Sequence, residues 1–129
     1  MKNLLDTHTF LWWLFDDPKL SNKAHRLIAN EKNKIFVSSA TAWEISTKYR
    51  LGKLPEAEAV AHDISSALSK SGFTPLNISI NHAQLAGSLP GHHRDPFDRM
   101  LSAVSMLENI PIITTDAIFK DYGAEVLWK

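Results

Sequence analysis

The sequence contains no cysteine among its 129 residues. This absence excludes disulfide-stapled scaffolds, thiol nucleophiles and thiolate metal sites. A long apolar segment is also missing, because the longest apolar run, residues 10–15, is far shorter than the roughly 20 residues that a membrane helix needs. The acidic Asp6 stands where a signal peptide would have its apolar centre. We therefore expect a soluble, cytoplasmic protein.

Neither sign of charge dominates, since 14 basic residues balance 14 acidic ones. A nucleic-acid ligand would therefore be bound by a local basic patch rather than by the overall field of the protein. Hydrophobic residues make up 44% and charged residues 22%, which is typical of a folded globular chain and excludes disorder. The length suits one domain, so we expect residues 1–129 to form a single unit.

Short apolar runs typical of strands alternate with segments that have helical spacing of their apolar residues. The sequence predicts strands over residues 3–5, 34–38, 75–78, 111–115 and 124–128, and helices over residues 22–31, 40–51, 57–70 and 96–107. This alternation predicts a compact α/β fold of three layers. Its central sheet should be mainly parallel and five-stranded, with helices on both faces.

Acidic residues follow the predicted strands. Asp6 comes directly after the first strand and Asp116 after the fourth, while Glu44 lies early in the helix that follows the second strand. Asp98 lies in the first turn of the helix over residues 96–107. Because ligands of such sheets bind outside the carboxyl ends of the strands, we expect these four carboxylates to meet at one edge.

Each acidic residue also has a purely structural interpretation. Asp6, Asp95 and Asp116 are good helix N-caps, worth about 1 kcal/mol each, and Glu44 is spaced to pair with Lys48 one helical turn later. These readings give no reason to gather four carboxylates, because two charges about 5 Å apart repel by roughly 3 kcal/mol at an effective dielectric near 20.

A hard divalent cation would supply that reason. Mg²⁺ prefers carboxylate and water oxygens, and two such ions suit in-line attack on a phosphodiester. The pattern therefore indicates metal-assisted phosphodiester hydrolysis. We expect Asp6, Asp98 and Asp116 to carry most of the coordination, with Glu44 binding a second ion or orienting the attacking water.

Basic residues near the acidic positions are candidates for contacts with the phosphates of a nucleic-acid substrate. They are Arg94, Arg99, Lys48, Arg50 and Lys53. Neutralisation of neighbouring acids and ordinary surface solubility are the alternative explanations. A general-base role for His92 or His93, which lie just before Asp95, is a further alternative.

The segment over residues 7–15 is apolar almost all round, whereas a surface helix should have a polar face. Such a helix is either enclosed in its own core or covered by another chain. We expect some of Phe10, Trp12, Trp13 and Phe15 to lie at a protein interface, where tryptophan is a favoured anchor.

Five segments together resemble the PIN-domain ribonucleases, in particular the VapC-type toxins of bacterial type II toxin–antitoxin pairs. They are Leu-Leu-Asp-Thr-His at 4–8, Val-Ser-Ser-Ala-Thr-Ala-Trp-Glu-Ile at 37–45, Leu-Gly-Lys-Leu at 51–54, His-Arg-Asp-Pro-Phe-Asp-Arg-Met at 93–100 and Ile-Thr-Thr-Asp at 113–116. The resemblance runs from Leu4 to about Gly123, and the order and spacing of the segments make it specific.

The resemblance implies an endoribonuclease that depends on Mg²⁺ or Mn²⁺. It places the acidic positions of the family at Asp6, Glu44, Asp98 and Asp116. It gives supporting roles to the hydroxyls of Thr7, Thr114 and Thr115, and Asp95 belongs to a signature of one branch, as a cap or a support for the acidic residues. The implied partners are an RNA substrate, a small antitoxin and a second copy of the chain.

Other functions stay open at this point. The same fold serves housekeeping RNA processing, and a PIN-like module without catalysis would bind RNA or protein only. An aspartyl-phosphate protein also places an acid after its first strand, but Thr7 and His8 lack the second carboxylate that such phosphotransferases use two residues further on.

Overall fold

The computed structural model describes residues 1–91 and 95–128. Within those ranges, five strands form one parallel sheet in the order β3-β2-β1-β4-β5. The strands are β1 (Lys2–Leu5), β2 (Lys34–Ser38), β3 (Thr74–Leu76), β4 (Ile112–Ile113) and β5 (Val126–Leu127). The predicted five-stranded parallel sheet is therefore confirmed.

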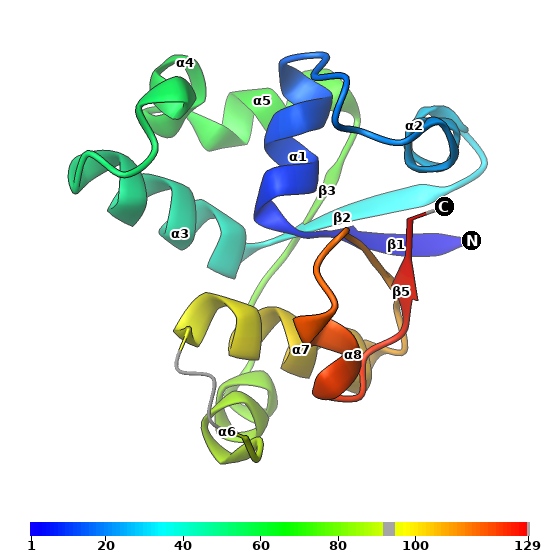
Figure 1. Cartoon of the computed structure of the whole chain (residues 1–129), viewed down its shortest axis with the longest axis vertical. Coiled ribbons are helices and arrows are strands. Elements are labelled where there is room, and N and C mark those ends of the chain that lie inside the picture. Colours follow the sequence, from blue (N-terminus) through cyan, green and yellow to red (C-terminus); the bar gives the residue numbers. More distant parts are fainter. Residues whose placement is uncertain (92–94, 129) are drawn as a thin grey trace.

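Helices cover both faces of the sheet. They are α1 (Thr7–Leu14), α2 (Asn22–Ala29), α3 (Ser39–Arg50), the 3-10 helix η1 (Pro55–Ala57), α4 (Glu58–Ala61), α5 (Ile64–Ser71), α6 (Ile80–Ser88), α7 (Pro96–Glu108) and α8 (Ile118–Asp121). Figure 1 shows α1, α2 and α5 on one side of the sheet and α6, α7 and α8 on the other. The predicted three-layer α/β fold is confirmed. None of the helices in the described ranges is long and apolar enough to cross a membrane.

The core consists of two apolar clusters, one on each face of the sheet. Leu5 and Phe10 belong to the cluster under α1, and Leu4 and Leu101 belong to the cluster under α7. Leu4 and Leu5 are both fully buried although successive strand residues point to opposite faces. A strand covered on both faces reads as a continuous apolar run, which is why these strands show no alternation.

The strand order reverses between β1 and β4. The chain moves outward from β1 to β2 and β3, and then returns to the other side of β1 to form β4 and β5. Leu5 and Ile113 are partners in the register of β1 and β4. The residues that follow, Asp6 and Thr114, therefore emerge side by side at the switch point where ligands bind in open parallel sheets.

The helix predicted over residues 57–70 is divided into α4 and α5. The side chain of Asp63 accepts hydrogen bonds from the backbone N–H of Ser66 at 3.1 Å and from its hydroxyl at 2.7 Å, so that it caps a new helix. Apolar spacing alone did not reveal this break, because the apolar positions continue on the same face on either side of it.

Two helices were not predicted from the sequence, namely α6 and the short α8. The start of α6 is fixed by a reciprocal pair of bonds, in which the Ser79 hydroxyl accepts from the N–H of His82 and the ring Nδ1 of His82 accepts from the N–H of Ser79. This pair has the form of a capping box with histidine in the place usually taken by Glu or Gln. Helix α6 packs on α7 and so supports the helix that carries Asp98.

Candidate active site

A cavity of about 280 Å³ lies at the carboxyl ends of β1 and β4, and we refer to it as the acid cavity. It is lined by Asp6, Thr7, His8, Trp12, Glu44, Lys48, Asp95, Asp98, Thr115 and Asp116. The four acidic residues predicted as catalytic and metal-binding therefore line one cavity. They come from separate segments, since Glu44 lies on α3 and Asp98 on α7.

Asp6 is buried at the junction of β1 and α1. Its Oδ1 accepts a hydrogen bond from the backbone N–H of Thr9 at 2.7 Å and so caps α1, and its Oδ2 accepts one from the hydroxyl of Thr114. Burial raises the pKa of Asp6, and this effect outweighs the hydrogen bonds from Thr114 and Thr9, which lower it. A buried carboxylate of this kind gains from a nearby positive charge.

Thr114 connects Asp6 with Asp116. The oxygen of the fully buried Thr114 hydroxyl also accepts a hydrogen bond from the backbone N–H of Asp116 at 3.0 Å. The Oδ1 of Asp116 in turn accepts from the N–H of Ile118 at 3.0 Å. Thr114 thus holds the turn after β4 in a shape that brings Asp116 to the acid cavity, while Thr115 lines the cavity directly.

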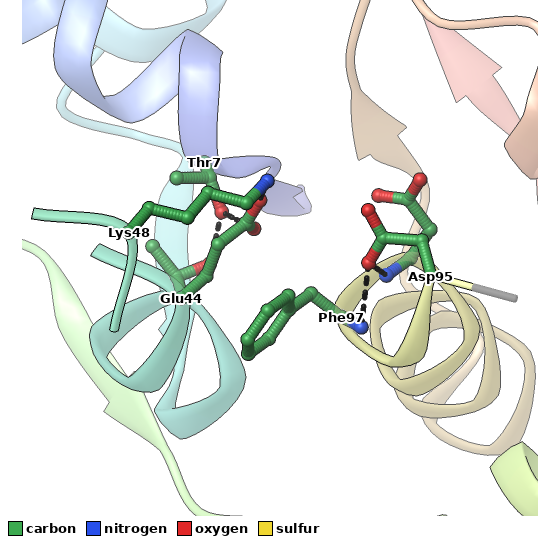
Figure 2. Close-up of polar contacts among 7 residues, drawn as sticks. Thr7, Glu44, Lys48, Asp95 and Phe97 are labelled. Atoms are coloured by element: carbon green, nitrogen blue, oxygen red, sulfur yellow. Dashed lines mark hydrogen bonds and ion pairs between the residues drawn. The ribbon is translucent and has the colours of Figure 1, made fainter. Parts of the chain in front are cut away.

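Glu44 is buried although it lies on a helix, with only 4% of its surface exposed. Its Oε1 accepts a hydrogen bond from the hydroxyl of Thr7 at 2.5 Å, and its Oε2 accepts one from the ammonium of Lys48. The structure therefore contains the pairing of Glu44 with Lys48 that was considered as the structural alternative. It also places Glu44 in the wall of the acid cavity (Figure 2).

The Lys48 ammonium lies among the carboxylates. Burial lowers the pKa of Lys48, but its hydrogen bond and attraction to Glu44, together with the negative charges of Asp95 and Asp98, outweigh burial and raise it. Figure 2 shows Thr7, Glu44 and Lys48 on one side of the site and Asp95 on the other. Lys48 therefore supplies positive charge to this acidic site.

Asp95 caps α7. Its Oδ1 accepts hydrogen bonds from the backbone N–H groups of Phe97 at 2.9 Å and Asp98 at 3.2 Å, as shown for Phe97 in Figure 2. The capping role expected from the sequence is confirmed, and Asp95 also lines the acid cavity. Asp98 lies in the first turn of α7 and is half-buried in the cavity wall.

The chemistry of these side chains suits a hard cation. Carboxylate oxygens are the preferred protein ligands of Mg²⁺, which usually keeps several water ligands as well. Across residues 1–91 and 95–128, no three His, Asp or Glu side chains are already arranged closely enough to hold one ion. A cation would therefore be held with water completing its coordination, or after small side-chain rotations within the cavity.

The basic residues predicted to contact RNA have different environments. Lys48 lines the acid cavity, whereas Arg50 and Lys53 are exposed outside its lining. Arg99 contacts the end of α6, where its Nε donates to the carbonyl of Ala86 at 2.9 Å and its guanidinium also donates to the carbonyl of Leu89, and its contact with RNA stays a prediction. Arg94, like His92 and His93, lies outside the described residues.

The interface expectation for α1 is wrong for Phe10, which is fully buried in the core of its own chain. Trp13 is half-buried and its ring lies 5.1 Å from that of His25, while Phe15 is 40% exposed. Trp12 lines the acid cavity. The apolar character of α1 is therefore explained in part by its own core and in part by the site.

His8 and Trp12 are cavity residues that the sequence reasoning did not assign to the site. They lie one helical turn apart on α1, with ring centroids separated by 6.0 Å. Their spacing from Asp6 could have indicated that they belong to the site. A helix capped by Asp6 presents residues of its first turns to the edge of the sheet at which Asp6 lies.

A family comparison matches residues 4–125 of this chain to the PIN domain. The chain belongs to the PIN domain family. The ribonuclease VapC16 of Mycobacterium tuberculosis is 38% identical over 65 residues, which are 50% of this chain and 45% of that protein. The chain therefore matches about half the length of this curated relative.

Solved structures share the fold at low sequence identity. VapBC2 from Rickettsia felis, bound to a DNA fragment from its promoter, is 20% identical with a TM-score of 0.70 over 100% of both chains. VapC20 of Mycobacterium tuberculosis, described as a toxin that cleaves the sarcin-ricin loop, is 15% identical with a TM-score of 0.67 over 100% of both chains. FitAcB from Neisseria gonorrhoeae is 16% identical with a TM-score of 0.66 over 98% of this chain and 96% of that one. These similarities agree with the resemblance inferred from the sequence.

Proposed function

We propose that this chain is an endoribonuclease that depends on Mg²⁺ or Mn²⁺ and acts as the toxin of a toxin–antitoxin pair. One observation carries the proposal, namely that Asp6, Glu44, Asp98 and Asp116, from four separate segments, line a single cavity at the switch point of the sheet. Four carboxylates gathered in this way repel one another unless they serve to bind positive charge. The relative VapC16, which is named a ribonuclease, supports RNA as the substrate.

Asp6, Asp98 and Asp116 would hold the metal ion, with Glu44 as a further ligand or as the group that orients the attacking water. A bound ion of this type lowers the pKa of water and neutralises charge on the phosphate that is attacked. The hydroxyls of Thr114 and Thr7 fix the carboxylates of Asp6 and Glu44 by direct hydrogen bonds.

Lys48 holds Glu44 in place and attracts the RNA backbone. Its ammonium bonds to Glu44 within a cavity that otherwise carries negative charge. A polyanionic substrate would otherwise be repelled by the carboxylates, so a cation at this position favours the approach of a phosphate. The site therefore orients its acidic groups through neighbouring hydroxyls and one ammonium.

A cleavage assay with purified protein tests the enzymatic part of the proposal. A mixed RNA pool should be cleaved with Mg²⁺ or Mn²⁺, and cleavage should stop with EDTA or with the substitution Asp98→Asn. The matched control is Asp16→Asn, because Asp16 is exposed, lies outside the acid cavity and has a φ of 52° that asparagine tolerates. Cleavage that persists after chelation would contradict the metal dependence.

Metal binding has a readout that does not depend on activity. The thermal midpoint of the wild type should rise when Mn²⁺ is added, because a ligand that binds only the folded state stabilises it. The rise should disappear in Asp98→Asn and persist in Asp16→Asn. An equal rise in all three proteins would place the bound ion outside the acid cavity.

The toxin assignment implies a small antitoxin and a second copy of the chain as partners. The fold is shared with VapC20, which is described as a toxin, and with VapBC2. Expression of this chain alone should arrest growth, and co-expression with the product of its neighbouring gene should restore it. Growth without arrest, combined with cleavage in vitro, would instead favour a housekeeping nuclease.

A further inference from the structure

A second cavity, of about 580 Å³, adjoins the acid cavity, and we refer to it as the side cavity. Its lining consists of Lys23, Thr114, Thr115, Asp116, Ala117, Lys120, Val126, Leu127 and Trp128. Thr115 and Asp116 line both cavities. The side cavity is therefore continuous with the wall of the proposed catalytic site.

The side cavity is basic where the acid cavity is acidic. Lys23 projects from α2 and Lys120 from α8, on two elements that face the same space. Among the described residues, neither ammonium has an ion pair or a side-chain hydrogen bond. Asp116, in the shared wall, is the one carboxylate in the described lining. An anion bound between the two lysines would therefore meet little opposing charge.

Part of the lining of the side cavity is apolar and aromatic. It is formed by Val126, Leu127 and the half-buried Trp128. The ring of Trp128 meets the ring of Trp12 edge-on, with centroids 5.8 Å apart. Because Trp12 lines the acid cavity, the two tryptophans form a continuous aromatic border along both cavities.

We propose that the side cavity binds the nucleotide next to the cleaved phosphodiester of a single-stranded RNA. The ammonium groups of Lys23 and Lys120 pair with its phosphate, and its base lies against the ring of Trp128. Cationic grooves combined with aromatic side chains are the usual means by which proteins hold single strands. The proposal rests on the ribonuclease function proposed above and specifies which part of the surface holds the substrate.

Binding of RNA to an inactive full-length chain tests this proposal. The probe is a short fluorescein-labelled oligouridylate, titrated into Asp98→Asn protein over a series of salt concentrations. Adding Lys23→Gln and Lys120→Gln should weaken binding at least about fivefold and reduce the salt slope by about 0.7, since both lysines pair with one phosphate and each phosphate contact to a single strand contributes about 0.7. The matched control adds Lys2→Gln and Lys32→Gln, which change two exposed lysines at the start of β1 and just before β2.

The base contact has its own test. Trp128→Leu should weaken binding about 5- to 150-fold, the range expected for loss of one base stacked on an aromatic ring. The effect should vanish for a probe of the same length that lacks bases. Because Trp128 also packs on the core, thermal unfolding checks each variant, and the lysine pair tests the proposal independently if Trp128→Leu does not fold.

The outcomes separate this proposal from the function on which it rests. If the wild type cleaves RNA but the lysine variants bind it as tightly as their background, with the same salt slope, the side cavity is not an RNA site. The ribonuclease function would then stand, and a protein segment would be the remaining occupant to test. If the wild type neither cleaves nor binds RNA, the proposed function itself is overturned.

Discussion

The hydroxyl of Thr114 donates a hydrogen bond to the carboxylate of Asp6, across 108 positions of sequence. Both side chains are buried, and they meet because β1 and β4 are neighbouring parallel strands that end at the same edge. The same hydroxyl oxygen accepts from the backbone N–H of Asp116. One threonine thus fixes the relative positions of two proposed metal ligands.

We expect Thr114→Val to damage the site more than its small change in volume suggests. The substitution removes a donor to Asp6 and an acceptor for Asp116 while keeping the side chain's shape. Loss of a group that orients a metal ligand typically costs about 10- to 100-fold in metal affinity or activity. Mn²⁺ titration and RNA cleavage measure this loss.

The matched control is Thr114→Ser, which retains the hydroxyl and should keep most of the activity. The free energy of unfolding of Thr114→Val should fall by about 1–3 kcal/mol, because a buried carboxylate loses a donor. Equal activity of the valine and serine variants would show that the hydroxyl does not position Asp6.

The raised pKa of Asp6 predicts that ionisation of this carboxyl lowers the free energy of unfolding of the metal-free protein. A carboxyl whose pKa is higher in the folded state binds its proton more tightly there than in the unfolded chain. The free energy of unfolding therefore falls as the pH rises from the unfolded pKa to the folded pKa, and the loss persists above that range. We expect Asp6→Asn to be more stable than the wild type at neutral pH in EDTA.

Chemical denaturation of both proteins between acidic and neutral pH measures this difference. The advantage of Asp6→Asn should shrink as the pH falls below the folded pKa of Asp6 and should reverse when Mn²⁺ is added, because the ion binds only the wild type. If the wild type were more stable than Asp6→Asn at neutral pH in EDTA, the ionised Asp6 would not destabilise the metal-free protein.

Lys48 should stabilise the metal-free site more than the metal-bound one. Lys48→Met keeps the apolar stem of the side chain but leaves Glu44 buried without its cation. Because Lys48 is partly exposed and its charge is screened, we expect a loss of about 1–2 kcal/mol in EDTA. Saturating Mn²⁺ should reduce the difference, since the ion supplies positive charge to the same carboxylates.

A double-mutant cycle with Glu44→Gln isolates the interaction free energy between Lys48 and Glu44. If Lys48 acts through Glu44, the two substitutions together should cost less than the sum of their separate costs in EDTA. Additive effects would show that Lys48 stabilises the fold through its other neighbours, Asp95 and Asp98.

The sequence was sufficient to predict where the carboxylates meet. Apolar runs such as residues 34–38 match β2 at both ends because strands covered on both faces contain little else. Once strands and helices alternate, the carboxyl ends of the strands must share an edge. The position of Asp6 directly after the first run therefore placed it at the site without any knowledge of its contacts.

Contacts between elements that are not neighbours in sequence could not be predicted. The spacing of Glu44 and Lys48 allowed their pairing as a structural alternative, but the proximity of Lys48 to Asp95 and Asp98 depends on how α3 packs beside α7. The contacts of Arg99 depend on α6, whose start is fixed by an unusual histidine in its capping box. Because α6 was not predicted from the sequence, the contacts that residues of α7 make with it could not be predicted either.

Arg99 should contribute to stability rather than to RNA binding. Arg99→Met removes the donors to the carbonyls of Ala86 and Leu89 at the end of α6. We expect a loss of about 1–2 kcal/mol in the free energy of unfolding, with unchanged affinity for the oligouridylate probe at a temperature where the variant is folded. Arg26→Met, at an exposed position of α2, is the control for the loss of a positive charge. A specific loss of RNA affinity in Arg99→Met would instead support the predicted contact of Arg99 with RNA.

The buried amide of Asn3 should be a site at which stability can be gained. Asn3 lies fully buried in β1, and neither its Oδ1 nor its Nδ2 has a hydrogen-bond partner among the described residues. An unsatisfied buried polar group costs about 1–3 kcal/mol, whereas an apolar side chain of similar size has no such cost. We therefore expect Asn3→Leu to raise the free energy of unfolding by about 1 kcal/mol and the thermal midpoint by about 4 °C.

The variant Asn3→Asp tests the same buried environment, and its expected effect on stability is opposite to that of Asn3→Leu. It has nearly the same shape as asparagine but would place an unpaired charge in the core, so it should lower the midpoint at neutral pH and recover at acidic pH, where the carboxyl is protonated. Activity should not change in Asn3→Leu, because Asn3 lies outside the lining of both cavities. A fall in stability of Asn3→Leu would mean that the amide has a partner in solution, such as a buried water that bridges its two polar atoms.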